Sequence, residues 1–324
     1  MRAVKAKWKL KKYGFKIDEG AEDEFINNLR YADDILLMAR SLPQLRNMLA
    51  DIDREAKKVG LTLHPEKTKI QHNGIGYGAG VKSAKCGDIT VEVLPTDAVT
   101  TYLGRSINLR AMDDTEVNAR IRKAWSKFGV YRGELIDTNI PIHLRMKLFE
   151  AVITPTVLYG CEAWTMTVKR QISLRTAQRK MVRCIMNAQR TYTDSNNYTG
   201  WRNSVTAKAD HLMNVHNVTC WAKVQRRRMW NWAGKMAAED DGRWNTAINK
   251  WQPCQTRPKG RPRTRWSDAL NAFLARVFCT SFNGKEWVSK AKQTKEWQEM
   301  GSRFVEEMCL NKADPKDSPL PAVF

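Results

Sequence analysis

Residues 28–39 read Asn-Leu-Arg-Tyr-Ala-Asp-Asp-Ile-Leu-Leu-Met-Ala, and this stretch decides the fold that the sequence predicts. Two adjacent carboxylates, Asp33 and Asp34, lie between two short runs of apolar, strand-favouring residues. Because this pattern is typical of a β-hairpin, we expect both carboxylates at one end of a rigid ribbon, at or beside the turn. There they repel each other unless a divalent cation neutralises them, and such hard oxygen ligands suit Mg²⁺, with Mn²⁺ as the alternative.

Aspartate is common in turns, so an Asp-Asp pair alone carries limited information. The chain contains two further pairs, Asp113-Asp114 and Asp240-Asp241. Both lie in polar surroundings just before segments with a helical pattern, where aspartate caps a helix or occupies its first turn. Only the pair at residues 33–34 has strand-favouring apolar residues on both sides, which favours a functional interpretation.

The tetrapeptide at residues 31–34, Tyr-Ala-Asp-Asp, resembles the catalytic motif of reverse transcriptases, in the form common in non-LTR retrotransposons. The resemblance implies that Asp33 is the principal metal ligand and that Asp34 is its companion. In this family two Mg²⁺ ions activate the primer 3′-hydroxyl and stabilise the loss of pyrophosphate. One ion also needs a carboxylate from an earlier palm strand, for which Asp51 and Asp53 on the next predicted helix are no substitute.

Two later stretches resemble motifs that follow this hairpin in the same family. Residues 60–69 contain Gly-Leu and then Lys-Thr-Lys, similar to a palm motif whose lysine approaches the triphosphate. The resemblance assigns that role to Lys67, with Lys69 as the fallback, and two solvated lysines on a strand are the alternative. His64 stands where the family usually has Asn. Tyr102-Leu103-Gly104 resembles the primer-grip turn, where the backbone and an aromatic side chain support the primer end.

The composition favours a polyanionic partner. The chain has 324 residues with 55 Lys+Arg against 34 Asp+Glu, a formal net charge of +21. Nucleic acid is the usual partner of so basic a chain, and a membrane is disfavoured because no apolar run approaches the length of a membrane span. Seven cysteines without metal-finger spacing indicate an intracellular protein rather than a secreted one. The resemblance implies the nucleus or the cytoplasm.

Local patterns predict the elements that follow the Asp-Asp hairpin. Residues 41–60 form a helix that starts at a capping serine and ends at a glycine. Its expected apolar face comprises Leu45, Met48, Leu49, Ile52, Ala56 and Val59. Residues 71–87 are Gly-rich and polar, which predicts a loop. Residues 89–93 and 99–103 favour two short strands.

From Thr115 the pattern changes to long helices with basic faces. After a palm, the first of them is where a thumb would follow the phosphates of a template–primer duplex, through Arg120, Lys123 and Lys127. A charged helix face is otherwise simply solvated. Residues 157–164 resemble a Leu-Tyr-Gly-x-Glu-x-Trp block downstream of the thumb in RTE/BovB-like elements, and we expect this block to serve packing.

A polar segment at residues 191–203 is a predicted linker. Beyond it, residues 226–232 interleave arginines with two tryptophans, as single-strand binders do, although helical tryptophans more often pack in a core. Residues 259–266 form an extended basic cluster that suits a phosphate backbone or a nuclear-import signal. The arginines expected to contact nucleic acid here are Arg226, Arg227, Arg228, Arg261, Arg263 and Arg265.

The sequence therefore predicts an α+β protein. A partial polymerase palm, with the Asp-Asp hairpin, a helix and short strands, is followed by a mainly helical thumb and a helical, basic C-terminal region. The expected boundaries are residues 1–110 for the palm, 111–190 for the thumb, 191–275 for the Trp- and Arg-rich nucleic-acid-binding region, and 276–324 for a helical end with a disordered tail.

The resemblance implies a fragment of an RNA-directed DNA polymerase, with an RNA template, a DNA primer or target and dNTP as its partners. The fingers and the palm strand with the third catalytic Asp are not found, so we expect the chain alone to be inactive. Mg²⁺ or Mn²⁺ would then bind only if the palm is completed. The alternative is a nucleic-acid-binding remnant that acts through the basic thumb and tail. A C-terminal endonuclease ranks third, because the chain lacks the Cys/His finger that usually accompanies one.

Overall fold

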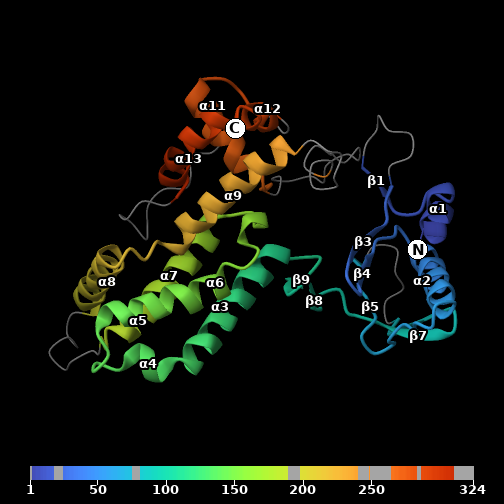
Figure 1. The fold of residues 1–324 in the computed structure, drawn as a ribbon, viewed down its shortest axis with the longest axis horizontal. Coiled ribbons are helices and arrows are strands. Elements are labelled where there is room, and N and C mark those ends of the chain that lie inside the picture. Colours follow the sequence, from blue (N-terminus) through green and yellow to red (C-terminus); the bar gives the residue numbers. More distant parts are fainter. Residues whose placement is uncertain are drawn as a thin grey trace. The chain divides into compact units, whose positions relative to one another are not determined.

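The computed structural model describes residues 2–17, 25–74, 81–188, 198–239, 248, 264–282 and 286–309. The chain divides into two compact units, Met1–Thr115 with Gly242–Arg257, and Glu116–Asp241 with Pro258–Phe324. The first unit contains helices and small sheets, and the described part of the second is helical (Figure 1). The α+β class predicted from the sequence is therefore confirmed.

The first unit alternates short strands with two helices in its described residues. Its elements are α1 (Arg2–Leu10), β1 (Phe15–Lys16), β2 (Phe25–Ile26), β3 (Asn28–Tyr31), β4 (Asp34–Leu37), α2 (Leu42–Lys57), β5 (Lys69–Ile70), β6 (Ser83–Cys86), β7 (Ile89–Val93), β8 (Thr100–Tyr102) and β9 (Arg105–Ile107). Strands β1 and β2 pair antiparallel, as do β3 with β4 and β8 with β9. Strand β7 lies between β5, to which it is parallel, and β6, to which it is antiparallel.

Helix α2 begins and ends for local reasons that the sequence shows. The Ser41 hydroxyl accepts a hydrogen bond from the Gln44 backbone N–H, and a proline occupies the first turn, where its missing N–H costs nothing. The helix ends at Lys57. Val59 was predicted on its apolar face, but it lies beyond the helix and is exposed.

Both sides of α2 are covered, and this makes it the centre of the first unit. Leu49 packs into the apolar cluster of the β5–β7–β6 sheet. Met48 and Ile52 pack instead against Trp8 of α1, which is fully buried. Leu37 of β4 touches both clusters, so the strand that follows the Asp-Asp pair is tied to the same core.

The predicted loop at residues 71–87 is wrong in its last part. Residues 83–86 form β6, whose side chains alternate between exposed and buried, with Ala84 and Cys86 inside. The strand is only four residues long, so its alternation of polar and apolar residues is a weak signal. The Gly-rich, polar residues before it therefore favour a loop when the sequence is considered alone. The predicted strand at residues 89–93 is confirmed as β7.

The second unit is built from helices of very different lengths. They are α3 (Met112–Val130), which starts at the boundary between the units, α4 (Arg132–Ile136), α5 (Ile142–Leu148), the π-helical turn η1 (Phe149–Ile153), α6 (Thr154–Val157), the 3₁₀ turn η2 (Cys161–Ala163), α7 (Val168–Ile185), α8 (Tyr198–Val215), α9 (Trp221–Ala238), α11 (Asp268–Phe278), α12 (Trp287–Ala291) and α13 (Thr294–Met308). None of the described helices is long and apolar enough to cross a membrane.

The block at residues 157–164 lies in the core, as its predicted packing role requires. Val157, Leu158, Cys161 and Trp164 are all fully buried among the helices from α3 to α9. The predicted linker at residues 191–203 is wrong in its second half, because α8 already begins at Tyr198. The tail from Ala313, which is expected to be disordered, lies outside the described residues.

Helices α9 and α13 meet at a reciprocal pair of tryptophans. The rings of Trp230 and Trp297 are stacked with centroids 3.7 Å apart, and each indole N–H donates to the backbone carbonyl of the other residue, at 2.9 and 3.1 Å. Four residues after each tryptophan, Gly234 and Gly301 leave room for the opposite ring. Trp230 is therefore a core residue and has no free face for a nucleobase.

We expect Gly234→Ala to destabilise the second unit. A Cβ at this position would lie 2.8 Å from Cδ1 of Trp297, a buried ring that cannot move aside. Overpacking of this kind costs about 1–3 kcal/mol. Gly129→Ala in α3 is the control, because nothing lies within 4 Å of the added carbon and alanine is the better helix former. Urea unfolding followed by tryptophan fluorescence gives the free energy of unfolding of each variant. Equal free energies for the two variants would contradict this packing.

Candidate active site and nucleic-acid interface

The Asp-Asp pair lies at the tip of the predicted hairpin. Strands β3 and β4 pair with Tyr31 opposite Asp34, so Ala32 and Asp33 form the two-residue turn. Ala32 has a φ of 50°, a left-handed conformation that costs a non-glycine residue about 1–2 kcal/mol. The side chains of both aspartates are exposed.

The side chains of these two aspartates have the chemistry that a divalent metal ion requires. Neither forms a hydrogen bond or an ion pair through its side chain with another described residue, so their oxygens are available. Carboxylate oxygens are the donors that Mg²⁺ and Mn²⁺ prefer, and the residues fit such an ion in chemistry. Within the described ranges, however, no group of three or more His, Cys, Asp or Glu side chains could hold a metal together.

A second hairpin approaches the first. Strands β8 and β9 are joined by Leu103 and Gly104, with φ values of 48° and 75°, as a two-residue turn with two left-handed residues requires. The Tyr102 hydroxyl donates a long hydrogen bond of 3.4 Å to the Leu29 carbonyl of β3. Burial raises the pKa of Tyr102, and the negative charge of Asp34 raises it further. The structure therefore brings Tyr102 and the Asp-Asp hairpin together.

The two candidate lysines differ in their surroundings. Lys67 lies in an exposed turn after α2, and its ammonium makes no ion pair in the described part of the chain. Lys69 lies on β5 opposite Glu92 of β7 and forms an ion pair with it. Lys69 is therefore held by Glu92, whereas the exposed Lys67 can reach a ligand.

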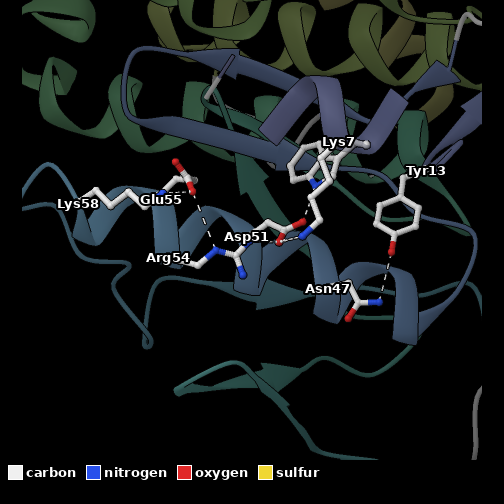
Figure 2. Close-up of polar contacts among 8 residues, drawn as sticks. Lys7, Tyr13, Asn47, Asp51, Arg54, Glu55 and Lys58 are labelled. Atoms are coloured by element: carbon white, nitrogen blue, oxygen red, sulfur yellow. Dashed lines mark hydrogen bonds and ion pairs between the residues drawn. The ribbon is translucent and has the colours of Figure 1, made fainter. Parts of the chain in front are cut away.

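Helix α1 is held to α2 by a buried carboxylate, as Figure 2 shows. Asp51 accepts from the Lys7 ammonium at 2.6 Å, from the Trp8 indole N–H at 3.1 Å and from the Arg54 guanidinium at 2.5 Å. Burial opposes its ionisation, but these hydrogen bonds outweigh burial, and the pKa of Asp51 lies below its ordinary value of 3.8. Sequence reasoning placed Asp51 on the helix but missed this role.

The segment before the Asp-Asp hairpin is fixed by a glycine. Gly14 has a φ of 101°, and a Cβ there would lie 2.2 Å from the Ile26 carbonyl oxygen. Its N–H donates to the Gln44 side chain of α2, and the Tyr13 carbonyl accepts from the buried amide of Asn27. Close backbone approach at Gly14 therefore ties the entry to β3 to the start of α2.

Two of the predicted phosphate-binding arginines are buried. Arg120 is paired with the buried Glu116 at 2.7 Å and lies over the ring of Tyr159. Arg226 is 1% exposed, its Nε has no partner in the described part of the chain, and burial lowers its pKa to about 10. Neither guanidinium can reach a phosphate, so we exclude both from the candidate interface.

Four other basic residues of these two helices that were predicted to bind nucleic acid are exposed. Lys123 and Lys127 lie on the outer side of α3, and the Lys127 ammonium lies over the Tyr131 ring. Arg227 and Arg228 follow the buried Arg226 on α9, and Arg228 also donates to the Leu158 carbonyl. These four cations can meet a polyanion without desolvation of the protein core.

The basic cluster at residues 259–266 is described only at its end. Arg261 and Arg263 lie outside the described residues. Arg265 is half-buried, and its backbone N–H donates to the Asp268 side chain at the start of α11. Trp266 next to it donates its indole N–H to the carbonyl of Glu162 in η2, within the same unit.

Comparison with known proteins agrees with the motifs of the first unit. Residues 9–117 match the family described as reverse transcriptase (RNA-dependent DNA polymerase). The chain is also 26% identical over 285 residues to an uncharacterized transposon-derived protein of Caenorhabditis elegans, across 84% of this chain and 94% of that protein. No solved structure matches the chain. The matched family region contains both hairpins and α2.

We expect Asp51→Asn to loosen α1 from α2. Hydrogen bonds to charged groups contribute about 1.5–3 kcal/mol, so hydrogen exchange at the amides of α1 should become faster by a corresponding factor. Glu55→Gln on the same helix is the control, because the ion pair of Glu55 with Lys58 is at the surface and should matter little. Equal exchange in the two variants would contradict the structural role of Asp51.

The contribution of Asp51 should also depend on pH. Because its folded-state pKa is lowered, the stabilisation is fully present above the ordinary value of 3.8 and is lost as the pH falls through the lowered pKa. The difference in unfolding free energy between the wild type and Asp51→Asn should therefore be constant near neutral pH and shrink below about pH 4. A difference that grows on acidification would contradict it.

Proposed function

Since this chain is related to the reverse transcriptases of transposable elements, we propose that it carries the catalytic hairpin and the helical thumb of a non-LTR, LINE-type enzyme similar to those of RTE/BovB-like elements. The observation that carries this proposal is the exposed Asp33-Asp34 turn with Tyr102 beside it, within the region that matches the family. Its substrates would be an RNA template, a DNA primer and dNTP.

In this proposal each residue near the hairpin has its own task. Asp33 and Asp34 would hold a divalent ion, which when bound supplies charge neutralisation for nucleotidyl transfer. Tyr102 braces β3 from the neighbouring hairpin and so fixes the direction of the tip. Leu103 and Gly104 would support the primer end with backbone groups. Lys67 would donate a proton or a charge to the leaving pyrophosphate.

We further propose that the chain by itself does not synthesise DNA. A two-metal mechanism needs more carboxylate ligands than the hairpin supplies, and no third metal-binding side chain joins the pair among the described residues. Asp51 cannot act as a substitute, because it is buried on α2 and saturated by three donors. Activity would require a further carboxylate that completes the site.

Primer extension and metal binding together test this proposal. With an RNA template, a DNA primer and Mg²⁺, the purified chain should give no product, and extension that is lost on Asp33→Ala would contradict its inactivity. A functional site needs the completed palm, so electron paramagnetic resonance titrations of this chain should detect at most a weak residual binding of Mn²⁺, and this binding should come from the hairpin. This binding should disappear in the double variant Asp33→Asn, Asp34→Asn and persist in Asp113→Asn, Asp114→Asn, a matched pair in the first turn of α3. Equal Mn²⁺ binding by the two double variants would exclude the hairpin as a metal site.

The second candidate function is nucleic-acid binding without synthesis, and the exposed cations of α3 and α9 favour it. Lys123, Lys127, Arg227 and Arg228 face solvent on a chain with a net charge of +21. Binding of this kind releases counterions from the nucleic acid, so its affinity falls steeply with salt. Arg261, Arg263 and Arg265 would add to it through their positive charge. The two candidate functions can be separated by Asp33→Ala, because DNA synthesis depends on Asp33 and nucleic-acid binding does not.

Lys127→Gln and Arg227→Gln should each weaken binding to an RNA–DNA duplex. Each lost phosphate contact lowers the slope of log affinity against log salt by about 0.9. Arg226→Met is the matched control, since its guanidinium is buried one residue away and should leave the affinity unchanged. Fluorescence anisotropy at several salt concentrations gives the slopes. An Arg226→Met effect as large as that of Arg227→Gln would show that surface charge is not the cause.

A further inference from the structure

The residues after α7 and the N-terminal half of α8 border an open hollow of about 500 Å³ in the second unit. Met186, Asn187 and Ala188 line it from the end of α7, and one face of α8 lines it from the other side through Trp201, Ser204 and Lys208. Its volume falls in the range of ordinary small-molecule sites, about 300–1,000 Å³. The hollow has no counterpart in the motifs of the sequence, where its residues lie in or beside the predicted linker.

Trp201 differs from the core tryptophans of the same unit. Trp221, Trp230 and Trp297 are each 0–2% exposed and stack on other rings inside the core. Trp201 is half-buried and lines the hollow, with the exposed ring of Tyr198 tilted against it at a centroid distance of 6.0 Å. It is therefore an indole that can still accept a planar ligand.

The charges around the hollow favour an anion. Lys208 lines it, and the other described residues of its wall carry no charge. Asp210, the acid nearest in sequence on α8, is held by Arg179 in a two-bond pair at 2.8 and 2.6 Å. At the end of α7 the buried Arg145 donates to the Ile185 carbonyl at 2.6 Å and so offsets the negative end of that helix. The first turn of the 18-residue α8 adds its positive end.

We propose that this hollow binds an unpaired nucleobase of a single nucleic-acid strand. The base would stack on Trp201, the Asn187 and Ser204 side chains would offer hydrogen bonds to its edge, and Lys208 would meet the adjoining phosphate. A base within a duplex is covered on both faces by its neighbours, so the site selects single strands. The inference rests on the proposed function for the class of partner, but it uses none of the residues of the Asp-Asp hairpin.

The test measures binding of a fluorescein-labelled 12-nucleotide single strand and of a 12-base-pair duplex to the full chain. Trp201→Ala should weaken the single strand about 5- to 100-fold, the range for loss of one base–aromatic stack, and change duplex affinity less than about twofold. Trp201→Phe keeps an aromatic face and should restore most of the affinity. Equal losses for both nucleic acids, or none for either, would overturn the proposal.

Two further experiments test the phosphate contact of Lys208 and whether the bound base belongs to a strand or to a free nucleotide. Lys208→Gln should lower the salt slope for the single strand by about 0.7, whereas Lys169→Gln, an exposed lysine of α7 outside the hollow, should leave it unchanged. Displacement of the strand by micromolar adenosine monophosphate would overturn the assignment to a strand, because the hollow would then be a mononucleotide site. Thermal melting checks that each variant is folded. Since the hairpin tests report on the first unit alone, failure there and failure here are distinguishable.

Discussion

The burial of α2 on two sides is the constraint on which the geometry of the candidate active site depends. One face of this helix packs on the β5–β7–β6 sheet through Leu49, and the other packs on α1 through Met48 and Ile52. Asp51 lies between these faces and is kept charged by Lys7, Trp8 and Arg54 (Figure 2). A charge removed from water in this way is stable only while all of its partners stay in place. The hairpin with Asp33 and Asp34 is joined to this core through Leu37, so a rigid base supports an exposed tip.

Asp51 and the Asp33-Asp34 pair differ in their surroundings, because Asp51 is buried and the pair is exposed. Asp51 has three donors and a lowered pKa, which leaves it no capacity for a metal ion. The two aspartates of the hairpin have exposed oxygens at a strained turn, in which Ala32 adopts a left-handed conformation. Strain of this kind persists only when the surrounding structure holds it, and here the β3–β4 ladder and Tyr102 do so.

Some arginines of the second unit are buried in its core, and the amino-acid composition does not show which ones. Arg145 donates hydrogen bonds to backbone carbonyls, and Arg120 forms an ion pair with the buried Glu116. Arg226 is buried in the core. Buried glutamines have a similar structural task. Gln178 bonds to the Thr219 carbonyl and the Trp221 N–H, and Gln225 bonds to the Cys161 carbonyl. The positive charge on the surface of this unit is therefore smaller than its number of arginines suggests.

The sequence by itself determined the hairpin at residues 28–37, the start of α2 at Ser41, the strand at residues 89–93 and the buried block at 157–164. These follow from local causes, namely alternation, capping and continuous apolar character, which act over a few residues. Only the tertiary structure decided which of Arg226 and Arg227 is exposed, because adjacent residues of a helix point about 100° apart and the packing partner selects the buried one. It also decided that residues 83–86 form a strand and that Asp51 binds α1, since both depend on partners distant in the sequence. The hollow beside Trp201 was also decided by the tertiary structure, because residues after α7 and residues of α8 line it together.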